Sequence, residues 1–274
     1  MISKYFLPGA AVIAAAIVLG SCSGREDTAN SLIFETYTGA ANYTLKGTAK
    51  VFGQDSDVVY SDSVSLILPL RINGADVSDL RDTIKSYALD IKDVPIRHAI
   101  SQWLRAKADE QGYEAVADKN ADDADIAQGF DIVSGFVVNL TPELLVYCVR
   151  NESYRCGAAH GMTSRRYINF ISTDRGEVLT LPKLFTAEGL RALPKRIAEQ
   201  ARAMRDVIGT THVNALPDNG NFYISSEGEI VFSYQPYEIA SYAQGTIDVP
   251  FFPYELSDLM TDYAVSLFNL EDMD

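Results

Sequence analysis

Histidine and cysteine are the side chains best suited to nucleophilic, acid–base or metal chemistry near neutral pH, and this chain holds only three of each. The histidines are His98, His160 and His212, and no two of them lie within four residues of one another. No Gly-x-Ser-x-Gly, His-Glu-x-x-His, Cys-x-x-Cys or glycine-rich phosphate loop accompanies them. The sequence therefore predicts no catalytic residue, no metal and no cofactor.

His160 has the most unusual surroundings of the three, because it lies in a run of small residues, Cys-Gly-Ala-Ala-His-Gly. Small residues let backbones approach closely or adopt positive φ. A histidine in such a run either donates to a carbonyl and fixes the connection between two strands, or lines a ligand site. In the second case the chain would be a hydrolase acting on peptidoglycan or another glycan, with His160 and a carboxylate such as Glu238 within hydrogen-bond reach.

Cys148 and Cys156 are the candidates for a disulfide. If residues 144–155 form one continuous strand, the eight steps between the two cysteines span roughly 26 Å, far beyond disulfide reach. If Asn151-Glu152-Ser153 is a turn, the two thiols face each other across a hairpin and can bond. Both arrangements are compatible with the sequence.

The surrounding elements alternate irregularly between strands and helices, which favours an α+β fold over a doubly wound sheet. We expect antiparallel sheets with a few packed helices, in two closely associated subdomains. β-rich segments predict strands at 43–52, 58–70, 130–140, 144–154, 166–171, 178–181, 222–224, 229–233 and 245–249. Apolar residues at helical spacing predict helices at 76–89, 94–107, from Thr186 as N-cap to about 207, and 253–268.

The third cysteine, Cys22, follows an N-terminal segment with one positive charge, Lys4, and an uncharged apolar run that ends in Leu-Gly-Ser. A basic start, a short apolar core and small residues before the cut are typical of a secretory signal peptide. A cysteine directly after Leu-Gly-Ser resembles the lipobox of bacterial lipoproteins. This resemblance implies cleavage between Ser21 and Cys22 and lipidation of Cys22. The protein would then be anchored to a membrane and face the periplasm or the cell surface.

The formal net charge is −14, and the segment before Cys22 carries only Lys4, so its removal makes the chain slightly more acidic. We expect no nucleic-acid partner, because phosphate binding needs clustered Lys and Arg. Anionic lipid would also repel the chain, so the lipid rather than the protein surface would hold it to a membrane. A basic partner would be attracted.

The predicted organisation is a signal peptide at 1–21, a lipidated tether at 22–42, an N-terminal α+β domain at 43–160 and a C-terminal α+β domain at 161–274. A run with two tyrosines around a proline, Tyr-Gln-Pro-Tyr-Glu-Ile, lies in the second domain. The candidate ligand-binding residues are Tyr234, Tyr237 and Glu238 of this run and the nearby Tyr242, since tyrosine offers contact area with a polar tip. The alternative is a packed corner in which the proline fixes the turn.

Four motifs in sequence order resemble the extracellular C-terminal domain of RsiV-type anti-sigma factors. They are Tyr-Arg-Cys-Gly-Ala-Ala-His-Gly at 154–161, Tyr-Ile-Asn-Phe at 167–170, Leu-Thr-Leu-Pro-Lys-Leu-Phe at 179–185 and Phe-Ser-Tyr-Gln-Pro-Tyr-Glu-Ile-Ala-Ser-Tyr-Ala-Gln-Gly at 232–245. The chain departs from the family pattern at Ala158, Lys183 and Ser241. The family also carries a companion N-terminal domain of unknown function, which residues near 43–155 would match.

The resemblance implies an α+β module of the cell envelope, and in the RsiV-type member this domain binds lysozyme. An anti-sigma role is not expected to carry over, because the sequence shows no transmembrane helix after the signal and no sigma-binding segment. We therefore expect a lipid-anchored binding module that recognises a lysozyme-like basic protein or a peptidoglycan ligand. The alternatives are the hydrolase built on His160 and a structural subunit of an envelope assembly.

Overall fold

The computed structural model describes residues 14–19, 32–51, 54–111, 114–115, 127–156, 158–172, 176–204 and 213–271. Cys22 and His212, together with the predicted cleavage site, lie outside these residues. The chain divides into two compact units. Unit 1 comprises residues 1–74, 81–136 and 149–163, and unit 2 comprises residues 75–80, 137–148 and 164–274.

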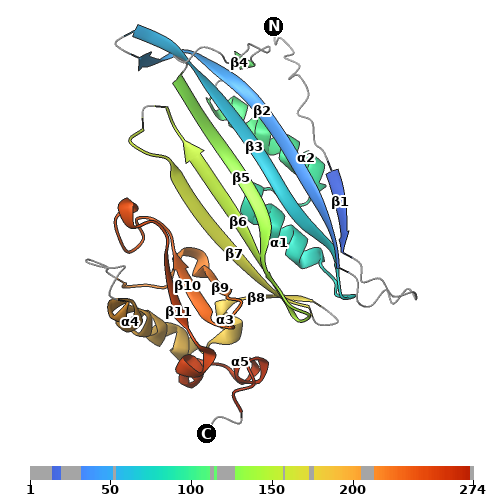
Figure 1. The fold of residues 1–274 in the computed structure, drawn as a ribbon, viewed down its shortest axis with the longest axis vertical. Helices are drawn as coiled ribbons and strands as arrows, with labels where there is room; N and C mark the ends of the chain where they lie inside the picture. The colour runs from blue at the N-terminus through green and yellow to red at the C-terminus, as the bar shows by residue number, and fades with distance from the viewer. Residues whose placement is uncertain are drawn as a thin grey trace. The chain divides into compact units, whose positions relative to one another are not determined.

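Unit 1 is built on two long antiparallel strands, β2 (Leu32–Val51) and β3 (Gln54–Ile72), whose register runs from Leu32 opposite Ile72 to Val51 opposite Gln54. The predicted tether therefore ends earlier than expected, since residues 32–42 are strand. The outer edge of β2 carries β1 (Ala14–Leu19) and the short β4 (Glu114–Ala115), both antiparallel. Within unit 1 the order along this sheet is β1-β2-β3 followed by β5, with β4 on β2 (Figure 1).

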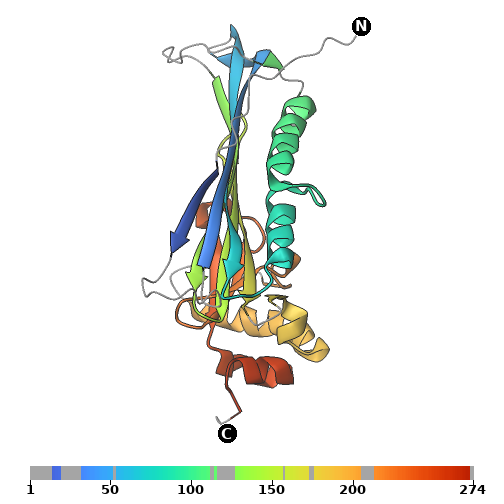
Figure 2. The same ribbon diagram turned by 90° about the vertical axis from the view of Figure 1, so that its right-hand side faces the viewer.

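Strand β5 (Ala127–Leu140) lies parallel to β3, from Val58 opposite Ala127 to Leu66 opposite Gly135. A parallel pair needs a long crossover, and helices α1 (Ser78–Leu89) and α2 (Ile96–Gln111) supply it. Helix α2 packs against β2 and β3 on one face of the sheet (Figure 2). Tyr43 is fully buried there, and its hydroxyl donates to the Leu104 carbonyl over 2.6 Å.

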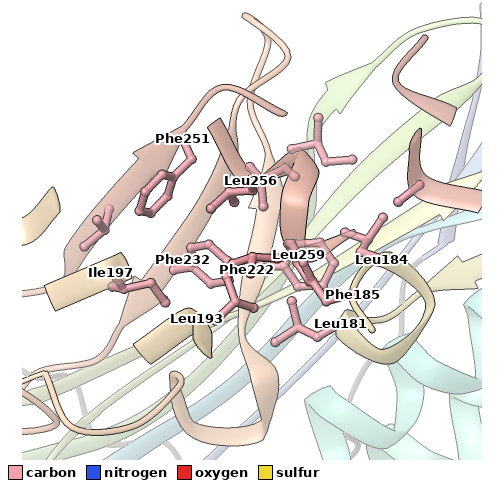
Figure 3. Close-up of a cluster of buried hydrophobic side chains, with 14 of the residues drawn as sticks. Leu181, Leu184, Phe185, Leu193, Ile197, Phe222, Phe232, Phe251, Leu256 and Leu259 are labelled. Atoms are coloured by element: carbon pink, nitrogen blue, oxygen red, sulfur yellow. The ribbon is translucent and has the colours of Figure 1, made fainter. Parts of the chain in front are cut away.

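Unit 2 holds a three-stranded antiparallel sheet in the order β11-β10-β9, covered by the helices around it. Its core gathers side chains from α3, α4, the three strands and η4 (Figure 3). Phe232 is fully buried in the centre of β10, with the Phe185 ring 6.3 Å and the Phe251 ring 5.9 Å away between centroids. The remaining elements are β6 (Leu144–Tyr154), β7 (Met162–Ile171), β8 (Glu177–Leu179), α3 (Leu181–Leu184), α4 (Ala187–Ala203), η2 (Asp218–Gly220), β9 (Phe222–Ile224), β10 (Ile230–Tyr234), η3 (Tyr242–Gln244), β11 (Ile247–Phe251), η4 (Pro253–Leu259) and α5 (Asp262–Leu267).

Helix α4 begins as the sequence predicts, because the Thr186 hydroxyl accepts a hydrogen bond from the Gly189 amide over 2.9 Å. The predicted helix over 253–268 is instead a 3₁₀ helix followed by a short α-helix. Met260 is extended between them and pairs with Phe185, and the Thr261 amide donates to the Leu184 carbonyl. These contacts with a distant part of the chain interrupt the helix that local spacing favours.

The α+β fold with antiparallel sheets is confirmed, and the β3–β5 pair is a parallel exception within it. β6 runs continuously from Leu144 to Tyr154, the arrangement in which Cys148 and Cys156 lie too far apart to pair. Neither of these two cysteines is in a disulfide in the part of the chain that the structure describes. No helix among the described residues is long and apolar enough to cross a membrane.

Candidate functional site

The loop that joins β10 to β11, residues 235–246, contains most of the predicted ligand-binding residues, and we call it the tyrosine loop. Tyr234 precedes it as the last residue of β10 and is 1% exposed. Its hydroxyl donates to the Ala215 carbonyl over 2.8 Å, and burial raises its pKa. Tyr234 therefore anchors the loop in the core of unit 2, where it presents no surface to a ligand.

Glu238 holds the loop in shape from within. One carboxylate oxygen, Oε2, accepts from the Gln235 amide over 3.1 Å, and the other, Oε1, accepts from the Asp218 amide over 3.3 Å. Burial raises the pKa of this carboxyl, and the Asp218 charge adds to the effect. Gln235 extends the framework, since its side-chain oxygen accepts from the Arg165 amide over 2.6 Å. The Glu238 carboxylate and the Gln235 side-chain oxygen are thus bound to the backbone, while Gln235 Nε2 has no hydrogen-bond partner among the described residues.

Tyr237 is the exposed aromatic residue of the tyrosine loop, and the half-buried Tyr242 lies beside it. Tyr237 is 58% exposed, and its ring lies 5.8 Å from that of Tyr242 between centroids, with the planes 31° apart. The backbone of Tyr237 has a φ of 75°, a region that bulky residues rarely adopt. A large aromatic side chain is therefore held toward solvent by a strained backbone.

A second exposed aromatic pair lies where β11 leads into η4. Phe252 and Tyr254 are 42% and 52% exposed, and their rings are stacked with planes 6° apart. The Glu255 carboxylate accepts from the Phe252 amide over 2.7 Å and caps the first turn of η4. No residue of this pair has a positive φ, so its exposure comes without the backbone strain seen at Tyr237.

His160 belongs to unit 1, whereas the tyrosine loop belongs to unit 2. The imidazole is half-buried, and its Nδ1 lies 2.9 Å from the carbonyl oxygen of Gly161. A side chain added at Gly161 would stand 3.0 Å from the Ser153 carbonyl oxygen, so the small residue serves close packing. The role of His160, either to fix the connection between strands or to line a ligand site, stays a prediction. Among the described residues no cluster of His, Cys, Asp and Glu is arranged to hold a metal ion.

The structure reveals a buried charge cluster in unit 1 that the sequence did not indicate. Asp62 on β3 is 1% exposed and lies opposite Asp131 on the parallel strand β5. One Asp62 oxygen accepts from the Asp131 amide over 3.1 Å, while Oδ2 has no hydrogen-bond partner among the described residues. Arg155 lies 2.6 Å and Lys107 4.0 Å from the Asp131 carboxylate.

Burial, reinforced by the Asp131 charge, raises the pKa of Asp62 to about 6. Lys107, Arg155 and the hydrogen bond from the Asp131 amide lower the pKa of Asp62, but they do not cancel this rise. The cluster has the composition of an internal ion network rather than of a catalytic centre, since each charged group apart from one Asp62 oxygen is engaged within it.

Two asparagines join β7 to the small sheet of unit 2. Asn169, 1% exposed, donates to the Phe222 carbonyl and accepts from the Ile224 amide, both over 2.9 Å. Asn221 accepts from the Tyr167 amide and donates to the Arg165 and Ser233 carbonyls. The Tyr-Ile-Asn-Phe motif is thereby structural, because its asparagine satisfies the edge of β9 as a neighbouring strand would.

Residues 182–255 match the family described as "Protein of unknown function (DUF3298)". This DUF3298 segment contains α4, all three strands of the small sheet and the whole tyrosine loop.

Two solved structures of DUF3298 family proteins share the fold. One, from Bacteroides fragilis, is 16% identical with a TM-score of 0.58, and the likeness covers 90% of this chain and 99% of the other. The second, from Pseudomonas aeruginosa, is 13% identical with a TM-score of 0.50, covering 83% of this chain and 95% of the other. No functionally curated protein matches the chain. The likeness therefore concerns the fold, and the DUF3298 segment brings no established activity with it.

Proposed function

We propose that this chain is a lipid-anchored binding module of a bacterial cell envelope, attached to the membrane through Cys22 and without catalytic activity. The exposed, strained Tyr237 carries the proposal. A non-glycine residue at positive φ costs on the order of 1–3 kcal/mol, and such strain concentrates at functional sites. Here the Glu238 framework maintains it, although a glycine would relieve it.

The contact surface would be the Tyr237–Tyr242 pair. Tyrosine is enriched at binding sites because its ring offers a large contact area and loses little conformational entropy on binding. The framework beneath the pair is preorganised, so binding would not have to order the loop. This combination favours a recognition surface over a packed corner.

The partner would be a lysozyme-like basic protein or a peptidoglycan ligand. The net charge of −14 favours association with a basic protein, and the resemblance to the RsiV-type domain supports lysozyme in particular. Charge alone cannot distinguish partners, because any basic protein is attracted to an acidic one. The test must therefore separate recognition by the tyrosine loop from general attraction.

The experiment measures binding of immobilised protein to a lysozyme, to soluble peptidoglycan fragments and to an unrelated basic protein of similar size and charge. We expect one of the first two to remain bound at raised salt, while the unrelated protein dissociates. Tyr237→Ala and Tyr242→Ala should each weaken that binding at least tenfold. Tyr254→Ala is the matched control, because it removes a tyrosine of similar exposure from outside the loop.

Loss of all binding at modest salt, or equal effects of the Tyr237 and Tyr254 variants, would refute the proposal. Release of soluble sugar from peptidoglycan by the wild-type protein would instead support the hydrolase alternative. The lipid anchor is tested separately by the mass of the N-terminal peptide in the exported protein, which should begin with an acylated Cys22. A Cys22→Ser variant should lose the acyl chains and the membrane association.

A further inference from the structure

Strand β1 covers the edge of the large sheet of unit 1. Ala14–Leu19 pairs antiparallel with the first residues of β2 in an uninterrupted register, from Leu19 opposite Leu32 to Ala14 opposite Tyr37 (Figure 1). On its other side the same stretch of β2 pairs with β3. Residues 32–37 thus have both of their edges paired, and β1 satisfies the outer one.

The residues that form β1 belong to the predicted signal peptide. Cleavage between Ser21 and Cys22, on which this inference rests together with the proposed lipid anchor, removes β1 from the exported protein. The outer backbone groups of residues 32–37 then lose their partners. An open strand edge of this kind pairs readily with another strand.

We propose that the edge of β2 at Leu32–Tyr37 is the interface through which two copies of the exported chain pair, strand against strand. The sequence of this edge, Leu-Ile-Phe-Glu-Thr-Tyr, is rich in residues that favour strands and contains no proline, glycine or lysine. Its one charge is already engaged, since the Glu35 carboxylate accepts from the Tyr37 hydroxyl and lies 3.7 Å from Arg97. The pairing of β2 with β3 has a register shift between Ile33 and Phe34, but β1 pairs with residues 32–37 across this point in an uninterrupted register, so the irregularity does not block the outer edge.

The anchor geometry favours a second copy as the occupant. Only nine residues, 23–31, separate Cys22 from the start of β2. Such a segment reaches at most about 30 Å when extended, so the edge stays close to the membrane surface. The two N-termini of a six-residue antiparallel pair are separated by roughly 17 Å, well within the reach of both tethers. Confinement to one membrane also raises the effective concentration of the edges.

The experiment measures the molar mass of the chain from residue 22 onward, with Cys22→Ser, by size-exclusion chromatography with light scattering. We expect twice the monomer mass at high concentration. Thr36→Lys, which places a charge on the edge, should return the mass to that of a monomer. A peptide with the sequence of Ala14–Leu19 between solubilising lysines should do the same by reoccupying the edge.

Ser65→Lys is the matched control. Ser65 is exposed and lies on β3, where it pairs with Thr38 on one side and Ser134 on the other, so its edge is never open. This variant should remain dimeric. A monomeric chain at every concentration, or a dimer unaffected by Thr36→Lys and by the peptide, would overturn the inference.

The outcome is separable from that of the proposed function. Thr36→Lys should keep the binding assigned to the tyrosine loop, and Tyr237→Ala should keep the dimer. If the exported protein retains residues 1–21, its N-terminal mass shows that the premise of cleavage is wrong, whatever the binding assays give.

Discussion

Replacing Asp62 with asparagine should stabilise the protein at neutral pH, although it removes a charged side chain that sits beside two cations. Asp62 is 1% exposed, and its Oδ2 has no hydrogen-bond partner among the described residues. The groups that face it are Asp131 on β5, Lys107 on α2 and Arg155 after β6. Asparagine keeps the shape and an oxygen that accepts from the Asp131 amide, while the buried charge disappears.

The magnitude follows from the pKa. The pKa of the Asp62 carboxyl rises from 3.8 to about 6 on folding, mainly because burial disfavours its charged form. The folded state then binds the proton more tightly than the unfolded state, so the free energy of unfolding falls as the pH rises from about 4 to about 6. Each pKa unit corresponds to about 1.4 kcal/mol, and the full penalty above this range is therefore about 3 kcal/mol.

The assay is urea unfolding of the wild type and Asp62→Asn at a series of pH values from 4 to 7.5. We expect the variant to gain up to about 3 kcal/mol at pH 7.5 and nothing near pH 4, where the wild-type carboxyl is protonated. Asp109→Asn is the matched control, because it removes the same charge from an exposed position of unit 1. A variant less stable than the wild type at pH 7.5, or a difference that does not change with pH, would refute the reasoning.

Three further predictions concern unit 2. Asn169→Ala should lower the free energy of unfolding by about 2–4 kcal/mol in urea titrations, because a buried carbonyl and a buried amide of β9 lose their partner; a loss below 1 kcal/mol would contradict the role of this residue. Gly189→Ala should lower the free energy of unfolding by more than about 2 kcal/mol, since the added carbon would stand 2.2 Å from the Leu259 carbonyl oxygen. Its control is Gly228→Ala, where the added carbon meets open space. This variant should lower the free energy of unfolding by only about 1 kcal/mol, the cost of its positive φ. Tyr237→Gly should be about 1 kcal/mol more stable than Tyr237→Ala, as only the glycine relieves the strain, and both should bind equally poorly; equal stability of the two would show that the backbone is unstrained.

Local patterns predicted the elements whose causes are local. The β-rich segments at 222–224 and 229–233 predicted β9 and β10, and Thr186 marked the start of α4 because its hydroxyl caps the nearby Gly189 amide. The failure at 253–268 has a distant cause, since Met260 pairs with Phe185 across 75 residues of chain. The start of β2 was also missed, although residues 32–37 favour a strand. The small residues at 39–41, which lack a strand signal and are held by pairing with β3, separate them from the predicted strand.

The residues of the candidate site can likewise be separated into those that local sequence indicates and those that depend on distant contacts. Tyr237 and Tyr242 were found because aromatic residues around a proline are visible in the sequence, but the burial of Tyr234 in the same run was not. The Asp62–Asp131 pair joins residues 69 positions apart through a parallel register, which no local pattern encodes. Its only sequence signal is an aspartate within each of two β-rich segments, and exposed strands show the same pattern.

The framework of unit 2 also bears on how a partner would be recognised. Asn169, Asn221 and Glu238 of unit 2 all bind the backbone, so the proposed contact rests on the aromatic rings of Tyr237 and Tyr242. Ring contacts depend on buried area, which salt hardly affects, whereas the net charge acts over distance and is screened. If the proposed function is right, raised salt should slow association of a basic partner, and Tyr237→Ala should speed dissociation by a factor independent of salt.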